Sequence, residues 1–291
     1  YFTRIVRDKQ GRKMSKMLGN SPDPIALMDQ YGADGVRMGL MMAAPAGNDI
    51  LYDDALCEQG RNFCNKIWNA FRLVKGWDTA ADAGQPDYCA IASAWFDSVL
   101  QRTLAEVADL MGKFRISEAL TAVYRLFRDE FSSWYLEMVK PAYGTPIDAV
   151  TYNQTLNYFD VLLRLLHPFM PFITEELWQH LGERGEGDSI MTAALPVSGV
   201  CDNDLLKQME IAKEIVGGVR NIRKQKQIPG RDPLTLMVKG VWPEALLPVV
   251  AKMAGLDKIE AVQEIRRLPH SASRPQNMPS LLKTVLISKK N

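Results

Sequence analysis

Histidine and cysteine are scarce in this sequence, whose 291 residues include 3 histidines and 4 cysteines. The cysteines form no C-x-x-C pair and the histidines are scattered, so the ligand spacing typical of a zinc site is missing. We therefore predict no metal site and no bound zinc in this chain. Free, mostly buried thiols in a reducing cytosol are the simpler interpretation of the cysteines.

An excess of one charge and long apolar runs are also lacking. Lysine and arginine together number 35 against 34 aspartates and glutamates, for a net charge of +1. Composition therefore does not argue for a nucleic-acid partner, and any RNA-binding surface must come from local clustering. No apolar run approaches the roughly 20 residues that a transmembrane helix needs, and no secretory signal opens the chain. We predict a cytoplasmic protein without a membrane partner.

Over most of its length the chain shows the spacing of apolar residues that is typical of helices. Apolar residues recur at helical spacing in 58–76, 91–111, 117–138, 152–166 and 202–227. We expect Gly76 and Gly112 to end the first two helices, and Ser117 and Thr145 to cap the next two. The pair Gly217-Gly218 inside the last helix indicates a close backbone approach or a kink.

The pattern changes after about residue 231. Residues 234–238 and 284–288 are strand candidates, and 246–254 lies between them with helical character. These segments predict a small α/β region behind the helices.

Near the start, Lys13-Met14-Ser15-Lys16 places two ammonium groups around a small hydroxyl side chain. Such a loop can stabilise negative charge as it moves from an α-phosphate onto a pyrophosphate leaving group. Gly19-Asn20 supplies a turn that lets the loop move.

This run resembles the K-M-S-K-S loop of class I aminoacyl-tRNA synthetases, with a departure at Met17, where that family usually has Ser or Thr. Tyr31 to Arg37 is similar to the Y-G-A-D-x-x-R segment of the valine, isoleucine and leucine group. At positions i and i+3, Asp34 and Arg37 are predicted to pair on one helical face and brace the helix behind the loop.

Two further segments favour the valyl type within that group. Ala43 to Ile50 resembles the valyl A-P-x-G-x-D-I segment, and Arg61 to Ala70 resembles R-N-F-x-N-K-x-W-N-A. Isoleucyl enzymes usually have Y-R-K-I-R-N-T here, and leucyl enzymes have a run like R-F-L-N-R-V-W. His167 to Trp178 resembles H-P-x-x-P-F-x-T-E-E-L-W of the anticodon-binding helical domain.

The resemblance implies a mainly α fold with three regions. We expect the end of a Rossmann-type catalytic domain over 1–50, a helical-bundle anticodon-binding domain over 51–230, and the small α/β region over 231–291. The resemblance further implies a longer parent enzyme, a valine–tRNA ligase, with its H-I-G-H signature, valine pocket and editing domain upstream of Tyr1. We therefore expect this chain alone to bind tRNA and not to catalyse.

The resemblance also implies roles for the loop residues. Lys16 and Lys13 would stabilise the triphosphate of ATP during adenylation, and Met14 and Ser15 would complete the ATP-binding loop. ATP enters as a substrate, with Mg²⁺ expected in the full enzyme and no metal site in this fragment. The partners implied are valine tRNA and the upstream catalytic and editing domains of the same polypeptide.

Two groups of residues are candidates for tRNA contact. The amides and cations of one group suit anticodon bases, and the cations of the other suit phosphates, which would release counterions. Cross-linking within the bundle and a solvated helix face are the respective alternatives. The groups are Arg61, Asn62, Asn65, Lys66 and Asn69, and Arg220, Arg223, Lys224 and Lys226.

Several conspicuous residues are interpreted as structural. His167 is expected to satisfy backbone groups at a corner between two helices, next to turn-forming prolines. The tryptophans at 68, 95, 134 and 178 fit core packing better than base stacking because most fall on apolar stripes. Alternative hypotheses are an isoleucyl- or leucyl-type fragment and a non-catalytic tRNA-binding helical protein.

Overall fold

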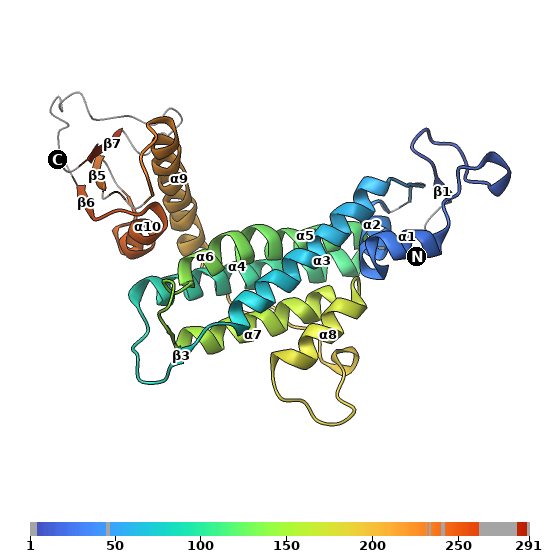
Figure 1. Cartoon of the computed structure of the whole chain (residues 1–291), viewed down its shortest axis with the longest axis horizontal. Helices are drawn as coiled ribbons and strands as arrows, with labels where there is room; N and C mark the ends of the chain where they lie inside the picture. The colour runs from blue at the N-terminus through green and yellow to red at the C-terminus, as the bar shows by residue number, and fades with distance from the viewer. Residues whose placement is uncertain are drawn as a thin grey trace. The chain divides into compact units, whose positions relative to one another are not determined.

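The computed structural model describes residues 5–44, 47–230, 232, 234–239, 242–261 and 284–289. Helices dominate it, which confirms the mainly α prediction (Figure 1). The helices are α1 (Pro24–Tyr31), α2 (Ala33–Met42), α3 (Asp54–Lys75), α4 (Asp87–Gly112), α5 (Ile116–Arg125), α6 (Leu136–Val139), α7 (Ala149–Leu166), α8 (Pro171–Leu181), α9 (Asn203–Gln225) and α10 (Leu247–Ala254). The strands are β1 (Val6–Arg7), β2 (Ile50–Leu51), β3 (Thr79–Ala80), β4 (Ile147–Asp148), β5 (Leu234–Lys239), β6 (Lys258–Ala261) and β7 (Thr284–Lys289).

The chain divides into two compact units. The first comprises Tyr1–Ala83, Val99–Trp134 and Pro141–Val200, and the second Gly84–Ser98, Tyr135–Lys140 and Cys201–Asn291. In the described part of the chain, no helix is both long and apolar enough to cross a membrane.

The core of the first unit is a cluster of aromatic rings between α3, the segment after α5, and α7. Phe127 and Phe131 both meet Phe159 edge to face, at centroid distances of 5.8 and 5.4 Å. Phe63 lies 5.5 Å from Phe127, and Phe71 lies 5.9 Å from Phe159. Edge-to-face pairs add to the stabilisation from area burial, so these rings hold the bundle helices together.

Glycine allows α2 and α3 to approach at backbone distance. A Cβ built at Gly60 of α3 would overlap the carbonyl oxygen of Gly35 in α2. A Cβ at Gly39 would lie 2.7 Å from the backbone nitrogen of Cys57. Helix α2 comes after the loop of Lys13 and Lys16 (residues 13–20, here called the lysine loop). It therefore packs directly on α3, the first bundle helix.

The third predicted helix is interrupted. Residues Leu126–Tyr135 are π-helical and lie between α5 and α6. Ser117 is not the cap of α5, as predicted, because its hydroxyl donates a 2.8 Å hydrogen bond to the carbonyl of Met42 in α2. A partner distant in sequence replaces the local one.

The next predicted cap is also displaced. Ile147–Asp148 pairs in parallel with Thr79–Ala80, and Asp148 caps α7 by accepting from the N–H of Thr151 at 2.8 Å. Thr145 instead donates its hydroxyl to the carbonyl of Ala142, so it stabilises the turn that precedes β4.

A long connection, residues 182–200, follows α8. Side-chain contacts bind it to α4, α7 and α8. Gln101 accepts from the N–H of Gly199 at 2.6 Å, and Arg164 donates to the carbonyl of Ala194 at 2.9 Å. Further contacts join Gln179 to the carbonyl of Asp188, Ser189 to Glu175, and Arg184 to Asp160.

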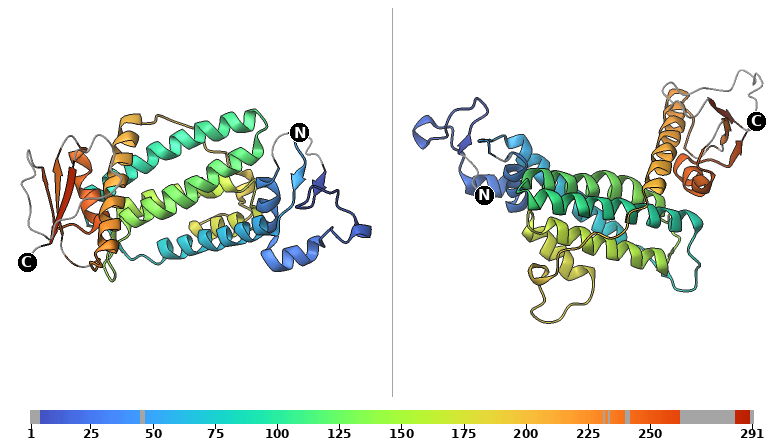
Figure 2. Two further views of the ribbon diagram at one scale, coloured as in Figure 1. Left: turned by 90° about the horizontal axis from the view of Figure 1, so that it is seen from above. Right: turned by 180° about the vertical axis from the view of Figure 1, so that it is seen from behind.

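The second unit contains α9, α10 and a three-stranded sheet of order β6-β5-β7 (Figure 2, where the strands are orange to red). β5 pairs in parallel with β6 and antiparallel with β7. These elements confirm the predicted α/β region. A close backbone approach, one of the two alternatives predicted for Gly217-Gly218, is absent at Gly217, because a Cβ there would meet nothing within 4 Å.

Candidate functional site

The loop between β1 and α1 carries the two predicted phosphate-binding lysines. Lys13 is bridged to Arg7, and Lys16 opens a 3-10 turn, Lys16–Leu18. Both lysine side chains are exposed, and neither ammonium has an ion pair or hydrogen bond to another described residue. Two uncommitted ammonium groups three residues apart in chain order are suited to an anionic ligand.

Ser15 shapes this turn. Its hydroxyl oxygen accepts a 3.2 Å hydrogen bond from the N–H of Met17. A hydroxyl that accepts one bond keeps its own proton to donate, so Ser15 remains able to contact a phosphate oxygen. Met14 is half-buried, whereas the Met17 side chain is 97% exposed and projects into solvent.

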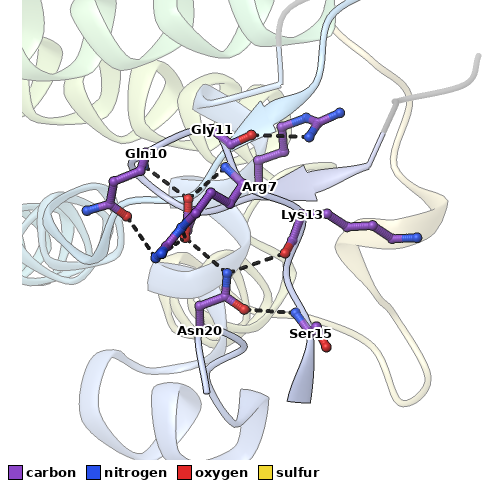
Figure 3. A network of polar contacts seen from close by, with 8 residues as sticks. Arg7, Gln10, Gly11, Lys13, Ser15 and Asn20 are labelled. Atoms are coloured by element: carbon purple, nitrogen blue, oxygen red, sulfur yellow. Dashed lines mark hydrogen bonds and ion pairs between the residues drawn. The ribbon is translucent and has the colours of Figure 1, made fainter. Parts of the chain in front are cut away.

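Asn20 is hydrogen-bonded to the loop backbone (Figure 3) and to the carboxylate of Asp8. Asn20 accepts from the N–H of Ser15 at 2.8 Å and donates to Asp8 at 3.0 Å and to the carbonyl of Lys13 at 3.3 Å. The bond from Asn20, with those from Arg12, lowers the pKa of the Asp8 carboxyl to about 2. Asn20 is therefore a bridge within the loop, which differs from the mobile turn predicted for it.

The predicted pairing of Asp34 with Arg37 is wrong. No hydrogen bond or ion pair joins these side chains in the described structure, and both reach the corner between α7 and α8 instead. Asp34 accepts from the backbone N–H groups of Phe172 and Ile173 at 3.3 and 2.7 Å. Arg37 donates to the carbonyls of Pro168 and Phe169, at 3.2 Å each. Burial raises the pKa of Asp34, and the two backbone hydrogen bonds oppose that shift.

His167 lies at the same corner. Its Nδ1 is 2.7 Å from Oγ1 of Thr174. The hypothesis that it has a structural place stands, but its partner is a side chain rather than the backbone groups predicted. Burial lowers the pKa of His167, and the nearby carboxylates of Glu175 and Asp34 oppose that shift.

The exposed side of α3 carries the first group of predicted tRNA contacts. Asn62 and Lys66 line a pocket of about 340 Å³, together with residues of α5 and of the π-helical segment that follows it. Phe63 and Tyr124 meet edge to face at 4.8 Å, and the guanidinium of Arg128 lies 5.6 Å from the Tyr124 ring centroid. The pocket lining thus combines amide and cationic groups with the carboxylate of Glu58 and with two rings, Phe63 and Tyr124, that are themselves buried.

Other residues of this group lie outside the pocket lining. Asn65 and Asn69 are exposed. Arg61 contacts other residues of the protein. Its guanidinium lies 5.9 Å from the Tyr31 ring centroid and 3.9 Å from the carboxylate of Glu58. Trp68 was predicted to be core, and this is wrong because it is 40% exposed.

The second group, on α9, separates into two classes. Lys224 and Lys226 are exposed. Arg220 donates to the carbonyl of Met253. Arg223 is 8% exposed, and its guanidinium donates to four carbonyls within its unit. These carbonyls belong to Ala254, Pro229, Asp232 and Gly255.

Burial lowers the pKa of the Arg223 guanidinium. Its donors face protein carbonyls rather than solvent, so the structure contradicts the predicted RNA contact at Arg223. Its burial could not be read from the sequence because three of its acceptors lie 9 to 32 residues away.

Sequence reasoning missed five residues of these sites. Asp8 and Asn20 lie within twelve residues of each other, close to the predicted loop, and their polar side chains were a readable signal. Tyr124 and Arg128, at i and i+4, are a recognisable aromatic–cation pair. Trp68 lies directly between predicted contacts, but its apolar character concealed its exposure.

Metal coordination finds no support in the part of the chain that the structure describes. No group of three or more His, Cys, Asp or Glu side chains there converges as a metal site would require.

Comparison with protein families finds two matches. The family described as the anticodon-binding domain of tRNA ligase matches residues 93–239, and the family of class I tRNA synthetases (I, L, M and V) matches residues 1–53. The first match covers most of α4 and the elements from α5 to β5, the second covers the loop of Lys13 and Lys16, and α3 lies outside both.

Curated relatives carry the name valine–tRNA ligase. One from Phocaeicola vulgatus is 65% identical over 264 residues, which are 90% of this chain and 30% of the relative. One from Parabacteroides distasonis is also 65% identical, over 91% of this chain and 30% of its own length. The chain therefore spans about 30% of the length of these relatives.

Among solved structures, a LeuRS–tRNA–LeuAMS ternary complex from Agrobacterium radiobacter K84 is similar in fold. The likeness has a TM-score of 0.50 at 20% sequence identity, over 83% of this chain and 26% of that one.

Proposed function

Because this chain belongs to the family of anticodon-binding domains of tRNA ligases, we propose that it is the part of a valine–tRNA ligase that binds tRNA and supplies the ATP-stabilising loop. The observation that carries the proposal is the joint presence of a free lysine loop and a polar–aromatic pocket on α3. The names of its relatives support valine over isoleucine or leucine.

In the activation step, Lys16 and Lys13 stabilise negative charge on the triphosphate as pyrophosphate leaves. Ser15 donates its free hydroxyl proton to a phosphate oxygen, and the Met14 backbone completes the loop. Mg²⁺ would accompany ATP and neutralise phosphate charge, and no residue of this chain is assigned to hold it. The uncommitted state of both ammonium groups supports this assignment.

In tRNA binding, the pocket on α3 receives an unpaired base. Single-stranded RNA is recognised by bases that stack on aromatic or guanidinium planes and bond through their edges. Asn62 offers an amide to a base edge, and Lys66 offers a cation to a phosphate. Asn65, Asn69 and the exposed Trp68 extend this surface along α3, and Lys224 and Lys226 add phosphate contacts.

The rest of the proposal concerns the parent protein. Residues 1–50 end its catalytic domain, 51–230 form the anticodon-binding domain, and 231–291 form an α/β region. The parent protein is cytoplasmic, and its upstream domains provide the valine pocket and editing. This chain alone binds tRNA without activating valine.

The loop is tested by valine-dependent ATP–pyrophosphate exchange in the full-length ligase. Lys16→Ala is expected to lower kcat by about 100-fold or more, because preorganised charge stabilisation at the reacting atoms is lost. The control is Lys9→Ala, which removes a nearby ammonium that is paired with Asp53 at 2.7 Å. Equal losses in both variants, or exchange by this chain alone, would contradict the assignment.

The pocket is tested by binding of this chain to valine tRNA with an intact or altered anticodon. Lys66→Ala should weaken both complexes alike and reduce the salt dependence, whereas Asn62→Ala should reduce discrimination between them. The control is Lys113→Ala, which removes a lysine paired with Asp109 on α4. Equal affinity of the unaltered chain for the two tRNAs would remove the anticodon role.

A further inference from the structure

The lysine loop cannot be fixed by apolar packing. Residues 15–19 contain no buried side chain, and the 3-10 turn that starts at Lys16 buries none of its members. Leu18 and Met17 are 65% and 97% exposed. Whatever determines the direction of Lys13 and Lys16 must therefore act through polar contacts on the loop backbone.

Asp8 provides the fixed end of such contacts. It is 8% exposed, and it receives hydrogen bonds from the N–H groups of Gln10 and Arg12 at 3.0 and 2.8 Å. The Nε of Arg12 donates to its second oxygen at 2.7 Å. A carboxylate bound from several sides is held in one orientation before any ligand arrives.

Asn20 transmits this orientation to the loop. Its amide nitrogen donates to Asp8 and to the carbonyl of Lys13, and its amide oxygen accepts from the N–H of Ser15. Only this orientation of the amide satisfies both neighbours, because Asp8 is an acceptor and the Ser15 N–H is a donor. One side chain thus fixes the backbone on both sides of Met14, and in Figure 3 the Lys13 side chain extends away from these contacts.

We propose that Asp8 and Asn20 are positioning residues for the activation step, which preorganise the loop so that both ammonium groups meet the triphosphate. This inference rests on the proposed function of the loop in ATP activation. The pair acts on the transition state through Lys13 and Lys16, and it touches neither ATP nor valine.

Electrostatics alone makes the opposite prediction for Asp8. Removing a carboxylate near a cationic loop should strengthen the binding of an anionic triphosphate. If Asp8 acts by positioning, Asp8→Asn should instead lower kcat, because the amide cannot accept at both oxygen positions. Electrostatics alone therefore predicts tighter binding of ATP in Asp8→Asn, whereas positioning predicts a lower kcat. Measuring both quantities distinguishes the two explanations.

The test is valine-dependent ATP–pyrophosphate exchange in the full-length ligase. Asp8→Asn and Asn20→Asp should each lower kcat by about 10- to 100-fold, with less change in the KM for ATP.

Two results would overturn the proposal while the proposed function of the loop survives, provided that Lys16→Ala still lowers exchange by about 100-fold or more. One is single variants within about twofold of the unaltered enzyme, and the other is a faster or tighter-binding Asp8→Asn. Unchanged exchange in Lys16→Ala would instead remove the proposed function itself.

A direct measurement covers the case in which a variant fails to fold. Amide hydrogen exchange of unaltered full-length ligase should show protection at Ser15, whose N–H is bonded to Asn20. Protection there should be lost in Asn20→Ala while β1 and α1 keep theirs. An unprotected Ser15 amide in the unaltered protein would overturn the proposal.

Discussion

The carboxylate of Asp34 accepts a 2.7 Å hydrogen bond from the backbone N–H of Ile173, a residue 139 positions further along the chain. Asp34 is near the start of α2, and Ile173 is in the first turn of α8. The first N–H groups of a helix have no partner within it. Asp34 supplies that partner from another helix, so it caps α8 across the fold.

Asp34→Ala should therefore lower the free energy of unfolding of this chain by about 2 kcal/mol. The substitution leaves two N–H groups at the start of α8 without an acceptor, which costs in the range measured for lost caps and unsatisfied buried donors. Urea unfolding followed by circular dichroism measures the change.

The matched control for this prediction is Asp29→Ala, which removes an exposed carboxylate from α1. It should stay within about 0.5 kcal/mol of the unaltered chain. Equal losses in the two variants would show that the contact with Ile173 adds no stability.

Two glycine-to-alanine substitutions should have opposite signs. Gly60→Ala forces a Cβ against the carbonyl of Gly35, and overpacking of this kind costs about 1–3 kcal/mol or more. Gly217→Ala places its Cβ in open space within α9, where alanine is the better helix former, and should stabilise by up to about 1 kcal/mol. Thermal unfolding of both variants measures the difference, and a shift of the same sign would contradict it.

Neighbouring cations on α9 should separate stability from RNA binding. Arg223→Met leaves four carbonyls without their donor and should cost about 3 kcal/mol. Lys224→Met should leave stability within about 0.5 kcal/mol and weaken tRNA binding instead, with a smaller salt dependence. Urea unfolding and tRNA titration of each variant check both halves, and loss of stability in Lys224→Met would refute the division.

The stability of this chain should fall as the pH drops below about 6.5, the ordinary pKa of histidine. Burial lowers the pKa of His167 in the folded chain, so the unfolded chain binds a proton first. This contribution is present above the unfolded pKa and is lost as the pH falls toward the folded one. Urea unfolding between pH 5 and 8 measures it.

His167→Asn should reduce that pH dependence, because the titrating ring is removed. His180→Asn, which changes an exposed histidine on α8, is the control and should retain it. An identical pH dependence in His167→Asn and the unaltered chain would rule out His167 as its source.

The sequence was sufficient for features that depend on local chemistry. Gly76 caps α3 and Gly112 ends α4 because a helix stop depends on residues within one turn. The strands β5 and β7 and the helix α10 followed from strand and helical patterns in the sequence, whereas β6 was not predicted. The role of the Lys13–Lys16 loop was predicted from its resemblance to the K-M-S-K-S loop of a known family.

Features that depend on distant partners could not be predicted in this way. Ser117 has the side chain of a good cap, yet the carbonyl of Met42, 75 residues away, takes its hydroxyl. Arg223 and Lys224 look alike in a basic run, and only the fold decides that one is buried and the other exposed. Asp34 and Arg37 have pairing distance along a helix, but the corner at 168–173 offers both a better-matched partner.

The connection over residues 182–200 has a consequence for how this chain is degraded. It lacks long regular structure and exposes apolar side chains such as Val197, so it is expected to be a site of proteolytic cleavage. Its side-chain ties to α4, α7 and α8 must open before the backbone can enter a protease cleft. Nicking there will then report how often those helices release the connection, a rate set by the opening equilibrium of the bundle.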